Sequence, residues 1–438
     1  MGTLSALLHK DYSPYLTRIF SKTWVLILLF LPFFKPGSFE YLGIPFNWID
    51  VLLTIAKAGV ALFACLLYLY NKKLSALTVS AGVFSALLLL STVLNHGNIK
   101  TALVYTVNIV GVCVLTELAA RYSFRNLLRS LYYLLSVLLI LHLASQFIFP
   151  NGMALHEYYN YKIYFMEIDN QMAPLVFLSM LVTILYSEYV YQRITWPAVG
   201  MLAVSSAIIL KSWSASALVG WFIFLVFLVF FYRRKLGRFF KFHYLAAAYI
   251  VIFFSFVVFR LQNLLSFIIV DILHKDLTFT HRTEFWDTAY SLIAGHWFVG
   301  LGVPIEKGHI WSIYYNKFFY GHNIAIELLL VGGILLLAAF LVALFFCGRR
   351  VISVKNHPWA TLVSALLFSF FIVMLMESYY QSTAFWPMLV IAFSLPSGIA
   401  EATEFQQQNP QLGERKGTSL KLHQFFCDFK QKMARSKK

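Results

Sequence analysis

Two basic side chains in the longest stretch between apolar runs are suited to chemistry, Arg282 and His322. An arginine guanidinium is always charged and can hold a phosphate through two parallel hydrogen bonds. A histidine titrates near neutrality and can act as a base or donate to a phosphate. Trp286 follows Arg282 by four residues, and His322 stands before a long apolar run. These residue types and positions predict a site for an anionic ligand that carries phosphate.

Both residues also have a purely structural explanation. Arg282 could pair with Glu284 or Asp287, which follow it in the same segment. His322 could simply cap the helix that the following apolar run predicts, and for this residue taken alone capping is the simpler explanation. We favour a chemical role for Arg282, because it stands beside a tryptophan in the longest polar stretch.

Four other polar residues, in or beside the apolar runs, are further candidates for binding a substrate. Lys211 and Arg260 each end an apolar run. There a cation could contact the same anion, or could extend to the membrane surface or pair with an acid such as Asp271. Asn323 and Glu327 are four residues apart and share one face of a helix. A buried acid is costly in an apolar helix, so Glu327 is predicted to face the site or to pair with a cation.

Other side chains could contact sugars. Asn170, within Asp169-Asn170-Gln171, could bind sugar hydroxyls, and Glu377 at the end of an apolar run could line the same cavity. The aromatic residues of the long polar stretch could stack on sugar rings or form the belt that aromatic side chains make at a membrane surface. They are Trp297, Trp311, Tyr314, Tyr315, Phe318, Phe319 and Tyr320. The histidines are scattered and the cysteines have no metal-binding spacing, so we expect no metal, no cofactor and no disulfide.

The elements that must position these residues are membrane helices. The chain of 438 residues is 60% hydrophobic, 18% aromatic and only 12% charged. No soluble core absorbs that much apolar surface, so the composition predicts an all-α polytopic integral membrane protein. The net charge of +16 comes from short basic clusters between apolar runs, which argues against nucleic acid as a partner.

Twelve apolar runs predict about twelve transmembrane helices. Their approximate ranges are 22–36, 48–70, 74–94, 101–120, 130–149, 171–190, 196–212, 214–232, 244–260, 322–346, 358–377 and 384–400. The first run is expected to be a span rather than a signal peptide, because Lys35-Pro36-Gly37 follows it in place of a cleavage site.

The basic residues orient these spans. All seven segments on one side of the predicted bundle are basic, and Lys and Arg mark cytoplasmic loops. We therefore expect a cytoplasmic N-terminal segment at 1–21, a membrane domain at 22–400 and a basic cytoplasmic tail at 401–438. The tail could lie on the anionic inner leaflet or be solvated. The largest outer loop covers about 261–321 and contains a predicted helix at 282–294.

At this point the motifs resemble a known family. His322-Asn323, followed after nine residues by Gly333, resembles the C-terminal signature of the O-antigen ligase and polymerase superfamily. The run Arg282, Trp286 and Gly300-Leu301-Gly302 resembles the segment that precedes this signature. Two shorter stretches resemble the family's polar turn before the sixth span and its Ser/Ala motif. They are Asp169-Asn170-Gln171 and Lys211-Ser212-Trp213-Ser214-Ala215-Ser216-Ala217.

The resemblance implies a metal-independent glycosyltransferase with a multi-spanning fold of the C type. Such enzymes use undecaprenyl-pyrophosphate-linked oligosaccharides at the outer face of the bacterial plasma membrane. By this resemblance Arg282 would clamp the pyrophosphate and His322 would orient or deprotonate the acceptor. Lys211 would replace the arginine that many members carry near the Ser/Ala motif, an inexact match. Membrane lipids, a flippase and chain-length regulators would be the further partners.

Leu336 bears on which reaction to expect. Ligases of the family often carry a second glycine at this position, three residues after the first, and here it is leucine. We therefore predict a polymerase that joins repeat units into a surface polysaccharide such as O-antigen, capsule or exopolysaccharide. A ligase for another acceptor, a flippase for lipid-linked sugars and a non-enzymatic scaffold are the alternatives. A flippase would often show internal repeats, which this sequence lacks.

Overall fold

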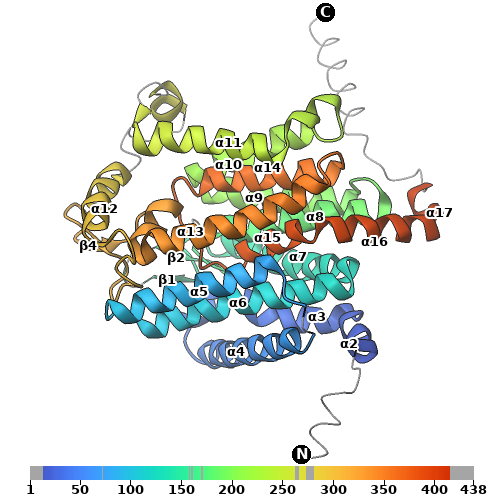
Figure 1. Ribbon diagram of the computed structural model, residues 1–438, viewed down its shortest axis with the longest axis horizontal. Coiled ribbons are helices and arrows are strands. Elements are labelled where there is room, and N and C mark those ends of the chain that lie inside the picture. The colour runs from blue at the N-terminus through green and yellow to red at the C-terminus, as the bar shows by residue number, and fades with distance from the viewer. Residues whose placement is uncertain are drawn as a thin grey trace, which may run out of the picture.

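The computed structural model describes residues 13–71, 73–156, 158, 161–168, 171–261, 266–272 and 281–414. Within these ranges the chain is almost entirely helical, with two short hairpins (Figure 1). The prediction of an all-α polytopic membrane protein is confirmed. Asn170, residues 1–12 of the predicted N-terminal segment, residues 262–265 and 273–280 of the predicted outer loop, and residues 415–438 of the predicted tail lie outside the described residues.

The two hairpins lie in longer connections, between α7 and α8 and between α12 and α13, and most of the helices follow one another closely. Their bounds are α2 Ser13–Phe20, α3 Thr23–Phe30, η1 Leu31–Phe34, η2 Gly37–Glu40, α4 Phe46–Tyr70, α5 Ala76–Leu94, α6 Ile99–Tyr122, α7 Phe124–Ile148, α8 Ala173–Tyr191, α9 Trp196–Ser212, α10 Ala215–Phe230, η4 Lys235–Phe239, α11 Phe242–Phe253, η5 Phe254–Val258, η7 Phe267–Ile272, α12 Arg282–His296, α13 Ile324–Ser353, α14 Pro358–Val373, α15 Phe385–Phe393, α16 Leu395–Gln408 and α17 Pro410–Glu414. The hairpins pair β1 (Ala154–Leu155) with β2 (Lys162–Ile163) and β3 (Ile310–Ser312) with β4 (Lys317–Phe319).

Each predicted span coincides with a helical segment of the described chain. Six helices are long and apolar enough to cross a membrane, namely α4, α5, α6, α7, α8 and α13. A seventh span results if α15 and α16, bent by 64° at their junction, are counted together. The remaining segments are shorter apolar helices, at Thr23–Phe34, Trp196–Ser212, Ala215–Phe230, Phe242–Val258 and Pro358–Val373.

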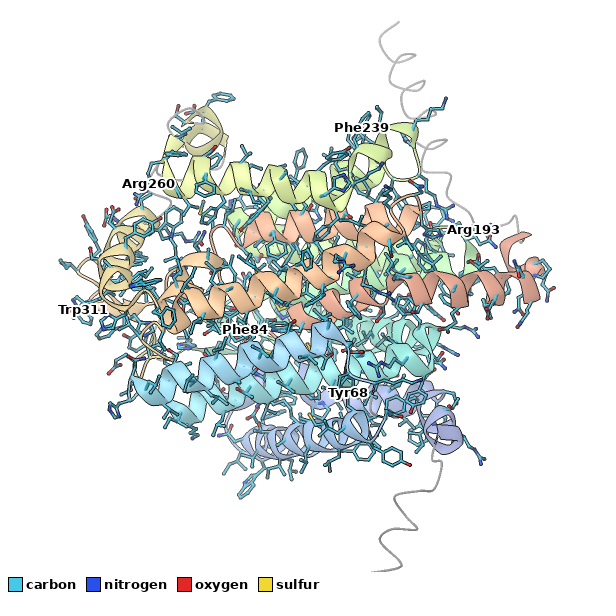
Figure 2. All side chains as sticks on the ribbon, in the orientation of Figure 1. Tyr68, Phe84, Arg193, Phe239, Arg260 and Trp311 are labelled. Atoms are coloured by element: carbon cyan, nitrogen blue, oxygen red, sulfur yellow. The ribbon has the colours of Figure 1, made fainter. Side chains whose placement is uncertain are left out.

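The long helices lie side by side along roughly one axis, so the bundle has two ends (Figure 1). Helix α12 and the hairpin of β3 and β4 lie at one end, and α16 and α17 reach the other. Arg260 and Trp311 lie at the first end, and Arg193 and Phe239 lie towards the second (Figure 2). The predicted outer loop and two predicted cytoplasmic loops are thus at opposite ends, as the predicted topology requires. Which end faces the cytoplasm stays a prediction.

Helix α13 is broken near its N-terminal end, at Gly333. This residue has a φ of 62° and a ψ of −162°, which interrupts the helix. The loop after α12 fills the break: the amide of Leu301 donates to the carbonyl oxygen of Leu330 at 2.7 Å, and that of Gly302 donates to Val331 at 2.9 Å. A broken helix is tolerated in a membrane protein where protein groups satisfy the freed backbone. The backbone of this loop is what approaches Gly333 most closely, at Phe298 and Val299.

Helix α5 holds the same loop from the other side. The hydroxyl oxygen of Ser91 lies 2.6 Å from the carbonyl oxygen of Val299 and 2.7 Å from that of Val331, so its single proton can be donated to either. The hydroxyl of Thr92 accepts from the amide of Val303 at 3.1 Å. The segment that follows α12 is therefore fixed between α5 and the break in α13, and this anchors the outer loop above the bundle.

Candidate active site

Three side chains at the end of the molecule that carries α12 converge on the carboxylate of Glu377. The guanidinium of Arg282 donates to Oε1 at 2.5 Å, and the hydroxyl of Tyr320 donates to Oε2 at 2.6 Å. Nδ1 of His322 lies 3.6 Å from the same Oε2, just beyond hydrogen-bond distance. The Glu377 side chain is only 2% exposed, whereas that of Arg282 is 20% exposed. The cluster is thus a buried carboxylate with an accessible arginine on one side and a histidine on the other.

These residues come from three separate parts of the chain. Arg282 is the first residue of α12, which spans Arg282–His296 where the sequence predicts a helix over 282–294. His322 lies between β4 and α13, in the left-handed region with a φ of 47°. Glu377 lies beyond the end of α14 at Val373. The predicted spans 322–346 and 358–377 include His322 and Glu377, but the helices leave both residues in outer connections.

Asn323 explains where α13 starts and how His322 is placed. Its side-chain oxygen accepts from the amides of Ala325 and Ile326 and so caps the helix. Its amide group donates to the carbonyl oxygen of Leu375 at 3.0 Å. Because Leu375 belongs to the connection that carries Glu377, this one side chain ties His322 to Glu377. Asn323 is fully buried, so it contacts protein on all sides.

Trp286 and Glu327 hold the residue before His322 in a similar way. The indole of Trp286 donates to the carbonyl oxygen of Gly321 at 3.0 Å. Oε2 of Glu327 accepts from the amide of the same glycine at 2.6 Å. Trp286 and Glu327 are buried, with 0% and 5% exposure. In this structure they support the backbone at Gly321, while Phe285 places its ring 5.8 Å from that of His322 in a stacked arrangement.

The electrostatics set the charges of the cluster. Burial alone would raise the pKa of Glu377, but the charge of Arg282 and hydrogen bonding to its neighbours outweigh it and lower the pKa to about 2. Burial, helped by the charge of Arg282, lowers the pKa of His322 below its usual value, although Glu377 acts in the opposite direction. Near neutral pH the cluster therefore holds a charged carboxylate, a charged guanidinium and a neutral imidazole.

The other predicted site residues lie around this cluster to different degrees. Arg260 donates to Oδ1 of Asp287 at 2.7 Å and lies 5.7 Å from the ring of Trp286, so it reaches the flank of α12. Its partner is Asp287 rather than Asp271. Lys211 ends α9 with its Nζ 5.2 Å from the ring of Phe147, and no described contact brings it to Glu377.

Glu377 is the functional candidate that sequence reasoning undervalued. From the sequence, Glu377 was a residue at the end of an apolar run that could line a cavity. It was not among the predicted catalytic or substrate-binding residues. A buried acid in such a run is costly unless a cation faces it, and this was the available signal. Nothing local indicated that its partner is Arg282, 95 residues away in the chain.

A comparison with known protein families identifies the part of the chain that carries Arg282 and His322. Residues 200–341 match the family model described as O-Antigen ligase. This match identifies residues 200–341 as a region of the O-antigen ligase and polymerase superfamily. The matched range includes Arg282 and His322, whereas Glu377 lies beyond it. No curated protein matches the chain.

The match over residues 200–341 supports a role in glycan transfer, and the family suggests a reaction like that of a glycosyltransferase. The site fits such a reaction, because it offers a cation, a neutral base and a buried carboxylate at one end of a membrane bundle. Among the described ranges, no group of three or more His, Cys, Asp or Glu residues is placed to hold a metal ion.

Proposed function

We propose that this protein is a polymerase that joins lipid-pyrophosphate-linked oligosaccharide repeat units into a surface polysaccharide at the outer face of the bacterial plasma membrane. The observation that supports it most is that Arg282 and His322 share one buried carboxylate, Glu377. A phosphate-binding cation and a base are thereby held next to each other, which is what transfer from a phosphorylated sugar needs.

Arg282 acts on the leaving group. Glu377 engages one N–H of the guanidinium among the described residues, and a guanidinium has five such donors. The remaining donors and the 20% exposure of the side chain leave Arg282 able to bind the pyrophosphate of the donor. Its positive charge stabilises the negative charge that develops on the pyrophosphate as the bond to the sugar breaks. Arg260 and Lys211 are proposed to contribute to the cationic surroundings at a greater distance.

His322 acts on the acceptor. A hydroxyl of the acceptor sugar attacks the anomeric carbon of the donor, a new C–O bond forms, and the C–O bond to the pyrophosphate breaks. The proton of the hydroxyl passes to the neutral imidazole of His322. The Glu377 carboxylate, 3.6 Å away, stabilises the resulting imidazolium. Asn323, Trp286 and Glu327 act as positioning residues that fix His322 against Glu377.

No nucleotide is required in this scheme, because the pyrophosphate leaving group supplies the driving force. The donor is proposed to be an undecaprenyl-pyrophosphate oligosaccharide delivered by a flippase, and chain-length regulators would be further partners. Both termini are proposed to be cytoplasmic, which places the Glu377 cluster outside. Asn170 is proposed to contact the sugar from the other outer loop.

A ligase is the second candidate, because the matching family model is described as O-Antigen ligase. A ligase would transfer finished glycan to a different acceptor. Leu336 is fully buried near the break in α13. Ligases of the family that this sequence resembles often carry glycine at this position. This difference is why polymerisation is preferred here.

The product formed from a single lipid-linked repeat unit tests the proposal. The purified protein should convert the repeat unit into a ladder of longer chains without nucleotide or added metal, and EDTA should leave the ladder unchanged. A ligase would leave chain length unchanged until given another acceptor, and a flippase would move the substrate without forming a glycosidic bond. Mass spectrometry of the product separates the three outcomes. Unextended repeat units alone would reject polymerisation.

A further inference from the structure

The two outer hairpins are joined above the Glu377 cluster. The amide of Phe318 in β4 donates to the hydroxyl of Tyr158, which lies between β1 and β2, at 2.9 Å. Nζ of Lys317 lies 5.5 Å from the centre of the same tyrosine ring. Residues 160 positions apart in the chain are therefore connected at the tips of two loops. This connection brings the first outer loop to the edge of the site.

Two partly exposed tyrosines, one from each hairpin, belong to the two loops that the hydrogen bond from β4 connects. Tyr161 is 46% exposed and Tyr315 is 42% exposed. The pKa of Tyr161 is raised by burial and by the nearby groups Tyr315 and Glu377, and Arg282 opposes this rise. Tyr161 follows Tyr158 by three residues, so it belongs to the loop that this hydrogen bond ties to β4, while Tyr315 lies in the turn between β3 and β4.

Tyr315 is linked to the same cluster through aromatic contacts. Its ring centre lies 5.4 Å from that of Phe319 and 5.9 Å from that of His281, the residue before Arg282. Phe319 in turn lies 6.0 Å from His322. The exposed face of Tyr315 is thus continuous with the site on both the arginine side and the histidine side.

We propose that Tyr161 and Tyr315 form a subsite for the glycan, which holds the sugar rings next to the phosphate bound by Arg282. A pyranose ring has an apolar C–H face and a rim of hydroxyl groups. A tyrosine offers a matching apolar ring with a polar tip, and it loses little conformational freedom on binding. This inference rests on the proposed function, because the position of the phosphate defines which sugars reach the two rings.

The aromatic belt of a membrane surface is the competing explanation for exposed tyrosines. Two observations favour a glycan. The ring of Tyr315 lies 5.9 Å from that of His281, the residue before Arg282, and a hydrogen bond from the backbone of β4 ties the two loops together. A belt residue needs neither feature, since it only has to reach the interface.

The test measures glycan binding without the phosphate. The probe is the oligosaccharide released by mild acid from the host's lipid-linked repeat units, and the readout is saturation-transfer NMR with the full-length protein in nanodiscs. Tyr161→Ala and Tyr315→Ala should each weaken binding about three- to tenfold, as for the loss of one aromatic contact. Tyr161→Phe and Tyr315→Phe should bind within about twofold of the unaltered protein, because the ring remains.

Trp311→Ala is the matched control. Trp311 is also 46% exposed and belongs to the same loop, but its ring packs edge-on against Phe318 at the outer edge of the molecule (Figure 2). Its replacement should leave the affinity unchanged. Arg282→Ala should also keep the affinity for the phosphate-free glycan while losing catalysis, which separates failure of this subsite from failure of the proposed reaction.

The subsite would be overturned by any of three results. The unaltered protein could show no saturable binding, both alanine variants could bind normally, or Trp311→Ala could lose as much affinity as they do. Phenylalanine variants that bind as weakly as the alanine variants would also count against ring stacking. An alanine variant that does not fold is replaced by Tyr161→Leu or Tyr315→Leu, which keep apolar volume without an aromatic face and should weaken binding in the same range.

Discussion

Nδ1 of His322 and Oε2 of Glu377 face each other across 3.6 Å, at the boundary of hydrogen bonding. Asn323 fixes this spacing, since it caps α13 beside His322 and bonds to Leu375 near Glu377. A neutral imidazole in this place can take up a proton, and the carboxylate then forms an ion pair with it. The spacing therefore predicts a base that the enzyme tunes through Glu377.

The pH dependence of the rate should show this tuning. A base works when deprotonated, so the rate should fall as acid protonates His322, with a midpoint below the ordinary value of 6.5 because the pKa is lowered. Glu377→Gln removes the anion that raises this pKa, while Arg282 still lowers it. The midpoint should therefore move to lower pH, and the maximal rate should fall. A midpoint that moves upward or stays in place would contradict the pairing.

Loss of His322 itself should be more severe. His322→Ala should reduce the rate about 100-fold or more, as expected when a general base is removed. The protein should remain folded, because Asn323 rather than His322 caps α13. The rate is measured as ladder formation per amount of purified protein. Full-length polymer made at the normal rate by His322→Ala would refute its role as the base.

Arg282 should be needed for both its charge and its shape. Arg282→Ala should abolish polymer, and Arg282→Lys should restore only part of it, because an ammonium is a point charge without the planar fork that binds phosphate. Arg349→Ala is the control. This exposed arginine lies in the last part of α13, far along the helix from Asn323, and its guanidinium lies 5.8 Å from the ring centre of Phe345. Gel analysis of polymer at matched expression levels measures all three. Normal polymer from Arg282→Ala would exclude the phosphate clamp.

The break in α13 should depend on two glycines. Gly300 has a φ of 74°, and a Cβ there would lie 2.6 Å from the amide nitrogen of Gly333. A Cβ on Gly333 would lie 2.3 Å from the carbonyl oxygen of Phe298. Gly300→Ala and Gly333→Ala should each lower stability by about 1–3 kcal/mol or more, through backbone strain and the lost loop contact.

Gly295→Ala is the matched control, because a Cβ at this position of α12 meets nothing within 4 Å. Alanine is also the better helix former, so this variant should be neutral or slightly stabilised. Thermal unfolding of the purified proteins in detergent measures the three variants. Equal melting temperatures for all three would show that the loop and the helix do not pack as described.

The basic loops predict which end of the bundle faces the cytoplasm. Reporters fused at Lys275 and Asn160, which lie outside the described residues, should report the outer side. Fusions at Lys235 in η4 and at Lys355 beyond α13 should report the cytoplasm. Paired phosphatase and fluorescent-protein fusions make this measurement. A cytoplasmic signal from Lys275 would remove both the predicted topology and the outer location of the Glu377 cluster.

The sequence by itself determined the class of protein and the places of its helices. Hydropathy is a local property, and a long run of apolar residues forms a helix in a membrane because a helix satisfies the backbone within that one segment. The twelve predicted spans therefore coincide with helical segments, and the helix beginning at Arg282 was predicted from its apolar stripe, of which Phe285, Trp286 and Ala289 are buried. The motifs around Arg282 and His322 led to the superfamily for the same reason, since they are short and contiguous.

Only the tertiary structure decided which of these residues meet. The partner of Arg282 is neither Glu284 nor Asp287, its neighbours in sequence, but Glu377. Glu284 lies near His281, and Asp287 pairs with Arg260. Likewise Gly300 meets Gly333 because the loop enters a broken helix, and Tyr158 reaches β4 from another loop. Burial makes such choices, because an acid removed from water must be met by whatever cation the packing of distant elements brings to it.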